Sequence, residues 1–434
     1  MKLLKKDKLA EIGSVASIVL AGGQGTRLQP LTTTRCKPAV SFGGKYRLID
    51  IPISNSLNSK IHKIFVISQY LAGSLKHHIN DTYLPSNFQK GDLEMLSPET
   101  AEGPDYFKGT ADAVRKNWEH LSQTPVEYFL ILSGDQLYNI DFSEMLNFAK
   151  QTNADLVIAS IPVEEAEAKR MGLLNINKNG LIEDFIEKPS DPKILKRFQL
   201  SKKQIPKSHK ESKHPLYLGS MGIYVFKKEV LARLLEEVGD DFGHDLIPLK
   251  VKGGNAYGYI YDGYWEDIGT IGSFYRANLA LTKESKQQHL DIYDENNPIY
   301  SRPCILPDAE IKGTSISDSI VSPGSIIEAK EIHHSIIGVS SCIHKGTVIK
   351  DSVILGNHFY PESYSHDKPL TTYFSIGENC IIEKAIIDEH THIGNNVRLI
   401  NQDNLIKYDG DGVYIRDGII VVTSGAVIPD GFTL

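Results

Sequence analysis

From Ser17 to about Leu281, short apolar runs alternate along the chain with segments whose apolar residues recur at helical spacing. The runs have the length of strands and are nearly continuous, which is typical of parallel strands covered on both faces. Asp112–Leu121 and Asp141–Lys150 have the helical spacing. This alternation predicts an α/β domain with a mostly parallel sheet. The predicted strands lie at Ser17–Leu20, Ile64–Ile67, Tyr128–Leu132 and Leu156–Ala159.

Beyond the polar segment Lys283–Tyr300, which is predicted to be a linker, the apolar period changes to six. Six-residue spacing is the signature of a parallel β-helix, in which each repeat forms one side of a triangular coil. The interruption between Asn357 and Thr372 is predicted to be a loop outside the coil. The aliphatic positions are Ile305 and Ile311; Ile320, Ile326 and Ile332; Ile337, Ile343, Ile349 and Leu355; Ile376 and Ile382; and Ile387, Ile393 and Leu399.

The predicted organisation is therefore an α/β domain over residues 1–281, a linker over 282–300 and a β-helix over 301–434. A chain of 434 residues is long enough for these two domains. The segment Ser190–Pro215 carries eight Lys or Arg residues against two acids. A solvated insertion is the favoured interpretation, because charge blocks are usually exposed, and a contact with a polyanion is the alternative.

Composition excludes several classes of protein. The net charge of −7 argues against a general nucleic-acid binder. No apolar run approaches the length needed to span a membrane, and the N-terminus lacks the apolar core of a secretory signal. The four cysteines are widely scattered, so we expect reduced, mostly buried thiols in a cytoplasmic protein.

A glycine-rich loop follows the first predicted strand. Gly22, Gly23 and Gly25 allow the backbone to approach a ligand closely, and its N–H groups can cradle an anion. Arg27 and Lys37 add positive charge beside the loop. Leu28 stands where a dinucleotide fingerprint needs a third glycine, and the P-loop pattern is also absent. The pattern favours a site for a nucleoside triphosphate.

Two aspartates and one lysine extend this candidate site. Asp135 follows a predicted strand at a turn, and Asp267 lies in an aromatic- and glycine-rich loop. Carboxylates suit a hard cation such as Mg²⁺. Lys188, after another predicted strand, is a candidate for a second phosphate. Because ligands bind at the carboxyl ends of strands in α/β sheets, the glycine-rich loop and Ser133–Asp135 should meet.

Hydrolase and histidine-metal chemistry find little support. There is no Gly-x-Ser-x-Gly elbow for a nucleophilic serine. The pairs His77–His78 and His333–His334 are adjacent, a poor spacing for a shared metal, and are predicted to be surface or packing residues. Nucleotidyl transfer needs no covalent nucleophile, because an acceptor phosphate can attack directly once charges are neutralised and positioned.

The motifs together resemble the glucose-1-phosphate adenylyltransferases, a branch of the sugar nucleotidyltransferases. The likeness runs from about Ser14 to the C-terminus. LAGGQGTRLQPLT is shared by sugar nucleotidyltransferases in general, whereas the other motifs are more particular to this family. These are Ser41–Ser59, Gly109–Arg115, Ser133–Tyr138, Phe185–Pro189, Ser220–Phe226, Asp241–Pro248 and Gly263–Ile271. Ser133–Tyr138 and Ala385–Asn404 look most like the plant and cyanobacterial branch.

The resemblance implies a Rossmann-like nucleotidyltransferase domain followed by a left-handed parallel β-helix. It implies transfer of the adenylyl group of ATP to α-D-glucose 1-phosphate with Mg²⁺, giving ADP-glucose and pyrophosphate. This reaction is the committed step of glycogen or starch synthesis. A homotetramer and regulation by a phosphorylated metabolite are also implied, without nucleic-acid or membrane partners.

The resemblance also implies a role for individual residues. The catalytic residues would be Arg27, Lys37 and Asp135, with Asp135 and Asp267 holding the metal. The nucleotide would be bound by Leu20, Gly22, Gly23, Gly25, Thr26, Gln69, Gly109, Thr110, Ala111 and Asp112. Glucose 1-phosphate would be bound by Phe107, Gly172, Glu187, Lys188 and Ser220. Arg47 is a possible effector residue.

The chain departs from the family at the effector positions. Thr34 and Ser41 stand where the enteric branch has Lys and His, although Arg47 is kept. Thr423–Gly425 precedes Ala426–Pro429, where the plant-like branch has an activator-binding Lys. Neither basic effector cluster is complete, so we expect altered or weakened activation. Phe107 stands where the enteric branch has Tyr, as in plant-like members.

Three alternatives stay open. The first is a related enzyme that uses UTP, dTTP or GTP, which the general glycine-rich loop permits. The second is a non-catalytic regulatory subunit of a hetero-tetramer, against which the intact set Arg27, Lys37, Asp135, Lys188 and Asp267 argues. The third is an acyltransferase, an activity common among hexad β-helices, although no catalytic role is evident for His344 or His358.

Overall fold

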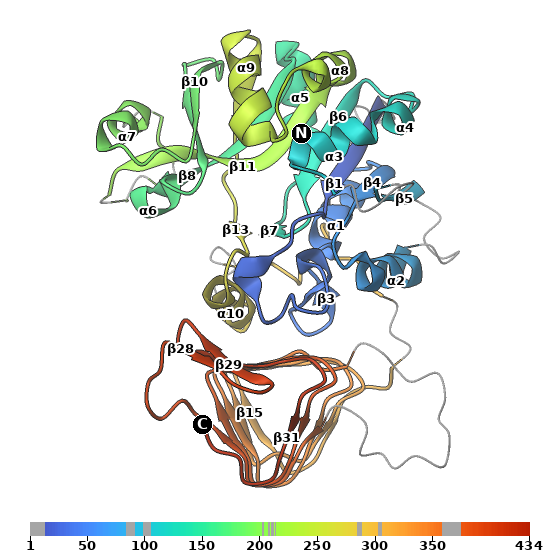
Figure 1. Ribbon diagram of the computed structural model, residues 1–434, viewed down its shortest axis with the longest axis vertical. Helices are drawn as coiled ribbons and strands as arrows, with labels where there is room; N and C mark the ends of the chain where they lie inside the picture. The colour runs from blue at the N-terminus through green and yellow to red at the C-terminus, as the bar shows by residue number, and fades with distance from the viewer. Residues whose placement is uncertain are drawn as a thin grey trace, which may run out of the picture.

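The computed structural model describes residues 14–83, 92–98, 106–201, 204–206, 209, 212, 214–283, 289–302, 306–357 and 375–434. Cys304, Ile305, His358 and the loop predicted after Asn357 lie outside these residues. The described chain forms an α/β domain with a triangular β-helix stacked beneath it (Figure 1). Helix α10 (Ile271–Ala280) lies between the two.

The α/β domain is built on a nine-stranded sheet in the order β10-β9-β11-β6-β1-β4-β5, with β8 paired to β11 and β12 paired to β8. Strands β6, β1, β4 and β5 are parallel, whereas β11 runs antiparallel to β6 and β8. The predicted α/β sheet is confirmed, and its parallel part carries the glycine-rich loop. The strands are β1 Val15–Leu20, β4 Lys63–Ile67, β5 Asp92–Leu96, β6 Tyr128–Ser133, β8 Leu156–Glu164, β9 Gly172–Ile176, β10 Ile182–Glu187, β11 Leu216–Lys227 and β12 Ala256–Ile260.

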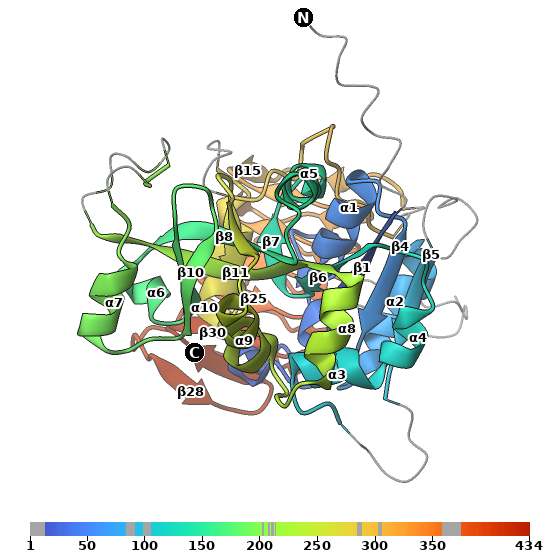
Figure 2. The same ribbon diagram turned by 90° about the horizontal axis from the view of Figure 1, so that it is seen from above.

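Helices cover both faces of the sheet, as its continuous apolar strands require. Within β1, Val15 and Val19 face one core, and Ala16 and Ile18 face the other. Figure 2 shows α8 and α3 on one side of the sheet and α5 and α1 on the other. The helices are α1 Asp50–Asn58, α2 Ala72–Tyr83, α3 Thr110–Lys116, α4 Trp118–Ser122, α5 Phe142–Thr152, α6 Glu165–Ala168, α7 Pro192–Phe198, α8 Lys228–Glu236 and α9 Ile247–Lys252.

Both segments with helical spacing are helical. Helix α5 begins after Asp141, whose carboxylate accepts the Ser143 N–H at 2.9 Å. The segment Asp112–Leu121 forms two consecutive helices, α3 and α4, with a one-residue break at Asn117 that the spacing did not indicate. The Asn117 side-chain amide donates to the Ala113 carbonyl at 2.8 Å and so ends α3.

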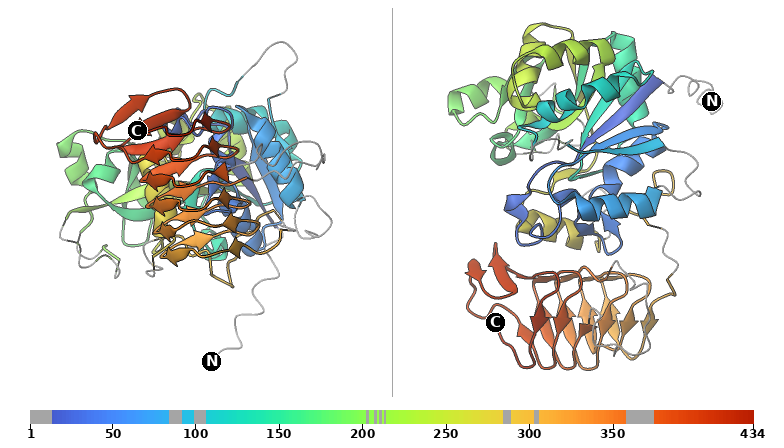
Figure 3. Two further views of the ribbon diagram at one scale, coloured as in Figure 1. Left: turned by 90° about the horizontal axis from the view of Figure 1, so that it is seen from below. Right: turned by 45° about the vertical axis from the view of Figure 1, so that its right-hand side comes forward.

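The β-helix consists of three sheets whose strands stack in parallel from coil to coil (Figure 3). Buried aliphatics form columns inside it, such as Ile332, Ile349, Ile382 and Leu399. Its strands are β14 Glu310–Ile311, β15 Ser315–Ser317, β16 Ile320–Val321, β17 Ile326–Ile327, β18 Glu331–His333, β19 Ile336–Ile337, β20 Cys342–Ile343, β21 Val348–Lys350, β22 Val353–Ile354, β23 Ser375–Ile376, β24 Ile381–Glu383, β25 Ala385–Ile387, β26 His392–Ile393, β27 Arg398–Leu399 and β31 Val427–Ile428.

Three of the predicted hexad positions are wrong. Val321, Ile327 and Ile354 point into the coil, in place of the predicted neighbours Ile320, Ile326 and Leu355. Paired aliphatics leave the inward residue ambiguous, because a shift of one residue turns a strand side chain to the other face. Ile326 is 45% exposed, and Leu355 packs against the α/β domain instead.

The last coil is extended by an antiparallel hairpin, formed by β28 Lys407–Asp409 and β29 Val413–Arg416, which joins β30 Ile419–Val422. In the turn between β29 and β30, Asp417 accepts the backbone N–H of Gly272 at the start of α10, at 3.1 Å. The hairpin therefore contacts the α/β domain through a helix N-terminus, where a carboxylate is stabilised.

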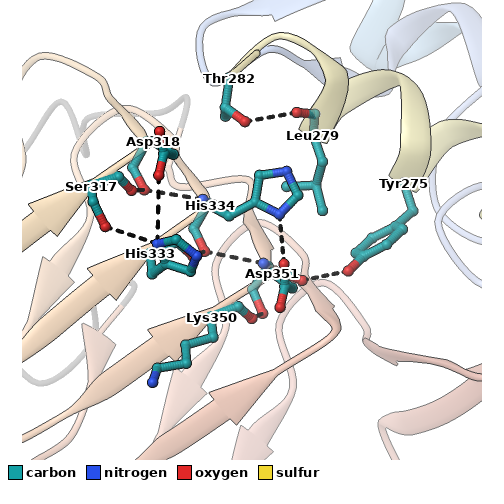
Figure 4. A network of polar contacts seen from close by, with 12 residues as sticks. Tyr275, Leu279, Thr282, Ser317, Asp318, His333, His334, Lys350 and Asp351 are labelled. Atoms are coloured by element: carbon teal, nitrogen blue, oxygen red, sulfur yellow. Dashed lines mark hydrogen bonds and ion pairs between the residues drawn. The ribbon is translucent and has the colours of Figure 1, made fainter.

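A second polar contact between the domains involves α10 and the β18–β21 side of the coil (Figure 4). The Tyr275 hydroxyl donates to the Asp351 carbonyl at 2.6 Å, and the Asp351 carboxylate contacts His334 Nδ1 at 2.5 Å. His333 contacts Ser317 at 2.8 Å. The prediction that these two histidines are surface or packing residues is confirmed.

A buried ion cluster also joins the domains. Arg35 pairs with Asp388, and Arg35 Nη1 lies 3.5 Å from the Glu389 carboxylate. Glu389 also accepts the Ser41 hydroxyl and lies 3.8 Å from Arg47 Nη2. All four charged side chains are no more than 4% exposed. Around them, aliphatic side chains of the β-helix pack into the core of the α/β domain.

We predict that Arg35→Met lowers the free energy of unfolding by about 3–5 kcal/mol, because Asp388 and Glu389 would keep only one buried partner. Denaturant unfolding measures the change. Arg197→Met is the matched control, since its partner Asp184 is exposed. That variant should lose less than about 1 kcal/mol. Equal losses in the two variants would contradict a structural role for the buried cluster.

Candidate active site

A cavity of about 1340 Å³ opens at the carboxyl ends of β1 and β6. The glycine-rich loop after β1 and the turn after β6 meet here, since the Gly134 N–H donates to the Leu20 carbonyl at 2.9 Å. This confirms the expectation that the two segments converge. Strands β7 Gln136–Tyr138 and β13 Trp265–Asp267 form a two-stranded ribbon that brings a third segment to the cavity.

The glycine-rich loop forms one wall. Gly22, Gly23, Gly25, Thr26 and Arg27 line the cavity, with the 3₁₀ turn η2 (Thr26–Leu28) at the end of the loop. Gly25 has φ of 64°, in the left-handed region, and a Cβ there would lie 3.0 Å from Lys37 Cβ. The loop can therefore pack against Lys37 only because this residue is glycine.

Lys37 joins the two predicted metal carboxylates. Its Nζ donates to Asp135 Oδ2 at 2.6 Å and lies 3.6 Å from Asp267 Oδ1. The 3₁₀ turn η3 (Lys37–Ala39), with Pro38 at its first turn, fixes the start of this side chain. Asp135 also accepts the Ser133 hydroxyl. Residues almost 100 and 230 positions apart in the sequence thus form one charged group.

The two carboxyl groups differ in their proton affinity. Burial raises the pKa of Asp267 and the negative charge of Asp135 adds to this, so that its pKa lies above the ordinary value despite Lys37, Arg27 and Arg170. Burial acts in the same direction on Asp135, but the charge and hydrogen bond of Lys37 outweigh it, and the pKa of Asp135 is lowered. Asp267 is therefore the carboxyl group that titrates first as the pH falls.

The opposite wall carries the residues predicted to bind a sugar phosphate. Lys188, just after β10, is 64% exposed toward solvent and pairs with Glu187 at 3.1 Å. A Cβ at Gly172 would lie 2.5 Å from the Phe185 ring and 2.6 Å from Glu187 Oε2, so no side chain fits there. Ser220 lines the same region, where the register of β11 shifts.

The side of the cavity near the end of β4 is organised by Gln69. Its amide donates to the Gly22 carbonyl at 2.9 Å and accepts the Phe107 N–H at 2.6 Å. Leu20, Phe107, Gly109 and Thr110 line the cavity, whereas Ala111 and Asp112 do not. The backbone N–H groups of these last two residues donate to the Asp240 carbonyl and so anchor the start of α3.

Arg47, the possible effector residue, lies outside the cavity lining. It is 3% exposed, donates to the Ala39 carbonyl and faces Glu389. Ser41, at one of the departing positions, bonds to the same Glu389. The carboxylates of the β-helix therefore neutralise the basic residues of this region.

Several lining residues were absent from the sequence prediction. Trp265 Nε1 donates to Gln136 Oε1 at 3.2 Å, and the Gln136 amide donates to the Met221 carbonyl at 2.8 Å. Trp265 could have been found from the sequence, because it lies in the motif Gly263–Ile271. Arg170 and Arg276 also line the cavity, but the sequence offered no signal for either, because neither lies in a quoted motif.

The donor set fits Mg²⁺. Asp135 and Asp267 both reach Lys37 Nζ, so their oxygens converge at one point of the cavity. Among the residues that the structure describes, no group of three or more His, Cys, Asp or Glu side chains could hold a metal by itself. Two carboxylates completed by substrate phosphates are an ordinary arrangement for Mg²⁺.

The chain matches the family model described as nucleotidyl transferase over residues 16–284. It therefore belongs to the nucleotidyl transferase family. Residues 304–433 match the model described as the GLGC left-handed parallel beta-helix domain. The pairing of these two domains is the architecture of glucose-1-phosphate adenylyltransferase, which confirms the resemblance found in the sequence. In the described part of the chain, every helix is too short or too polar to cross a membrane.

We predict that Mg²⁺ affinity falls as the pH drops through the raised pKa of Asp267, because protonation removes one of the two carboxylate ligands. The positive charge of Lys37 lowers the pKa of both aspartates, and Lys37→Met removes this charge. In that variant the fall in Mg²⁺ affinity should therefore occur at higher pH. Calorimetric titration with Mg²⁺ from acid to neutral pH measures this shift.

The control for this experiment is Lys63→Met, whose ammonium pairs with Asp92 away from the cavity. It should show the pH dependence of the unaltered protein. The same pH dependence in Lys37→Met would contradict the coupling between Lys37 and Asp267.

Proposed function

We propose that this protein transfers the adenylyl group of ATP to α-D-glucose 1-phosphate, giving ADP-glucose and pyrophosphate. The observation that carries the proposal is the contact of Lys37 with Asp135 and Asp267, in a cavity whose opposite wall carries Lys188. Such an arrangement provides cations for two phosphate groups and carboxylates for a metal between them. The family supports nucleotidyl transfer, and the motif Ser133–Tyr138 supports the adenylyl specificity.

In the proposed reaction, the glycine-rich loop and Arg27 bind the triphosphate, and Lys188 holds the sugar phosphate. An oxygen of the sugar phosphate attacks the α-phosphorus, and the bond to the β-phosphate breaks. Lys37 lies where it can offset the negative charge that develops on the α-phosphate. Bound Mg²⁺, held by Asp135 and Asp267, would supply further charge neutralisation.

Gln69, Gly109 and Thr110 would flank the nucleotide, and Gly172, Glu187 and Ser220 would contact the sugar. All six line the cavity. Ala111 and Asp112 would act indirectly, since they fix α3 through Asp240. Phe107 is 6% exposed and would serve as an apolar surface rather than a polar contact.

Competing functions receive less support. A purely regulatory subunit would not need Lys37, Asp135 and Asp267 in mutual contact. An acyltransferase would need a reactive group on the coil, yet His344 contacts only Cys342 Sγ, at 3.7 Å, among the described side chains. An enzyme for UTP, dTTP or GTP remains the nearest competitor, because the base-specific contacts rest on motif similarity.

We expect Asp135→Asn to lower the rate at least about 100-fold, because it removes a metal ligand and the charge that positions Lys37. Release of pyrophosphate with ATP, UTP, dTTP and GTP as competing donors measures rate and specificity together. Asp318→Asn on the β-helix, where the aspartate is 67% exposed, is the matched control and should keep full activity. A wild-type rate in Asp135→Asn would overturn the assignment, and preference for another nucleotide would overturn the adenylyl specificity.

We further propose that activation by phosphorylated metabolites is weak. Arg47, the one retained basic effector residue, is buried against Glu389, which would have to be displaced by an anion. We expect 3-phosphoglycerate to change the rate by less than about fivefold, which is the lower end of ordinary allosteric coupling. Glu389→Gln should increase the response, since it frees Arg47. A large activation of the unaltered protein by 3-phosphoglycerate would contradict this proposal.

The proposal extends to a cytoplasmic homotetramer that contributes to glycogen or starch synthesis. Cys36, Cys342 and Cys380 are unpaired thiols, which suits a reducing compartment supplied with ATP. The homotetramer is proposed from the resemblance to the glucose-1-phosphate adenylyltransferases.

A further inference from the structure

Arg170 enters the cavity from the loop between α6 and β9, outside every motif of the sequence. It meets two other charged side chains at Gly269. A Cβ at Gly269 would lie 3.5 Å from Arg170 Nη2, 3.7 Å from Arg27 Nη1 and 3.4 Å from Asp267 Oδ2. Three loops that are distant in the sequence therefore bring two guanidinium groups to one point beside a candidate metal ligand.

These two arginines differ from the other arginines of the region. Within the described residues, neither Arg27 nor Arg170 forms an ion pair within 4 Å or a side-chain hydrogen bond, and both are exposed. Arg35 and Arg47, by contrast, are buried against carboxylates. Arg276 lies next to Asp417 and interacts with Glu266. Two neighbouring cations with a single shared carboxylate leave an excess of positive charge that an anion would offset.

The chemistry of the site indicates which anion. A guanidinium group presents a planar fork that binds phosphate oxygens in pairs. Lys188 serves the opposite wall, and Lys37 lies between the two carboxylates. As the bond between the α- and β-phosphates breaks, its electron pair stays on the departing pyrophosphate, whose negative charge increases. The positive charges of Arg27 and Arg170 would stabilise this increased negative charge on the pyrophosphate.

We propose that Arg170 joins Arg27, already assigned to the triphosphate, in a two-guanidinium clamp that binds the β- and γ-phosphates of the nucleotide and the released pyrophosphate. The clamp rests on the proposed function for its place in the reaction, but it makes its own prediction about pyrophosphate. Arg170 is then a further binding residue, which contacts the phosphates of the nucleotide rather than the sugar phosphate.

The test compares Arg170→Gln, Arg170→Lys and the control Arg233→Gln. Arg233 is an exposed arginine of α8 outside the cavity lining. In Arg170→Gln we expect KM for ATP, and KM for pyrophosphate in the reverse reaction, to rise about tenfold through loss of charge-assisted bonds. KM for glucose 1-phosphate should change less than about twofold. Arg170→Lys keeps the positive charge but lacks the planar fork of donors. Its KM values for ATP and pyrophosphate should lie between those of the unaltered protein and those of Arg170→Gln.

Calorimetric titration with magnesium pyrophosphate separates the clamp from the proposed function. Weaker binding to Arg170→Gln than to Arg233→Gln supports the clamp, even if no nucleotide yields a sugar nucleotide and the proposed function fails. Equal pyrophosphate binding by the two variants overturns the clamp, even if ADP-glucose is made. A rise in KM for glucose 1-phosphate alone also overturns it, because Arg170 would then serve the sugar phosphate.

Discussion

The segment Arg35–Lys37 connects the two domains to the candidate active site. Arg35 extends into the β-helix and pairs with Asp388, whereas Lys37, two residues later, extends into the cavity and pairs with Asp135. Both side chains are largely buried, and each would leave an uncompensated charge if its partner moved. The docking of the β-helix and the position of Lys37 in the cavity are therefore held by one short stretch of backbone.

This arrangement gives the β-helix a physical connection to the candidate active site. Its carboxylates pair with Arg35, its aliphatic side chains enter the core of the α/β domain, and Asp417 accepts the Gly272 N–H at the start of α10. Helix α10 directly follows the segment that carries Asp267. The segment that carries Lys37 and the segment that carries Asp267 are thus both held in place by contacts with the β-helix. A displacement of the coil would reach Lys37 and Asp267 through packed side chains rather than through a long loop.

Much of the site was predictable because it consists of strand ends. The glycine-rich loop, Ser133–Asp135 and Lys188 each follow an apolar run, and the topology of an α/β sheet brings such ends together. Arg170 was not predictable, since it follows a short acidic helix with no periodic signal. Ala111 and Asp112 were placed in the site by motif similarity, but their contacts with Asp240 direct them away from the cavity.

The sequence by itself determined the two-domain architecture. Apolar runs that alternate with helical spacing in the first part of the chain, and a six-residue apolar period in the second, each reflect local backbone geometry. It could not decide whether Ile326 or Ile327 faces the coil, since adjacent aliphatics fit either face. Only the tertiary structure decided which charges meet: Arg47 with Glu389, Lys37 with two aspartates, and Arg27 with Arg170. Electrostatic energy depends on distances in space, and these partners lie between 98 and 342 residues apart along the chain.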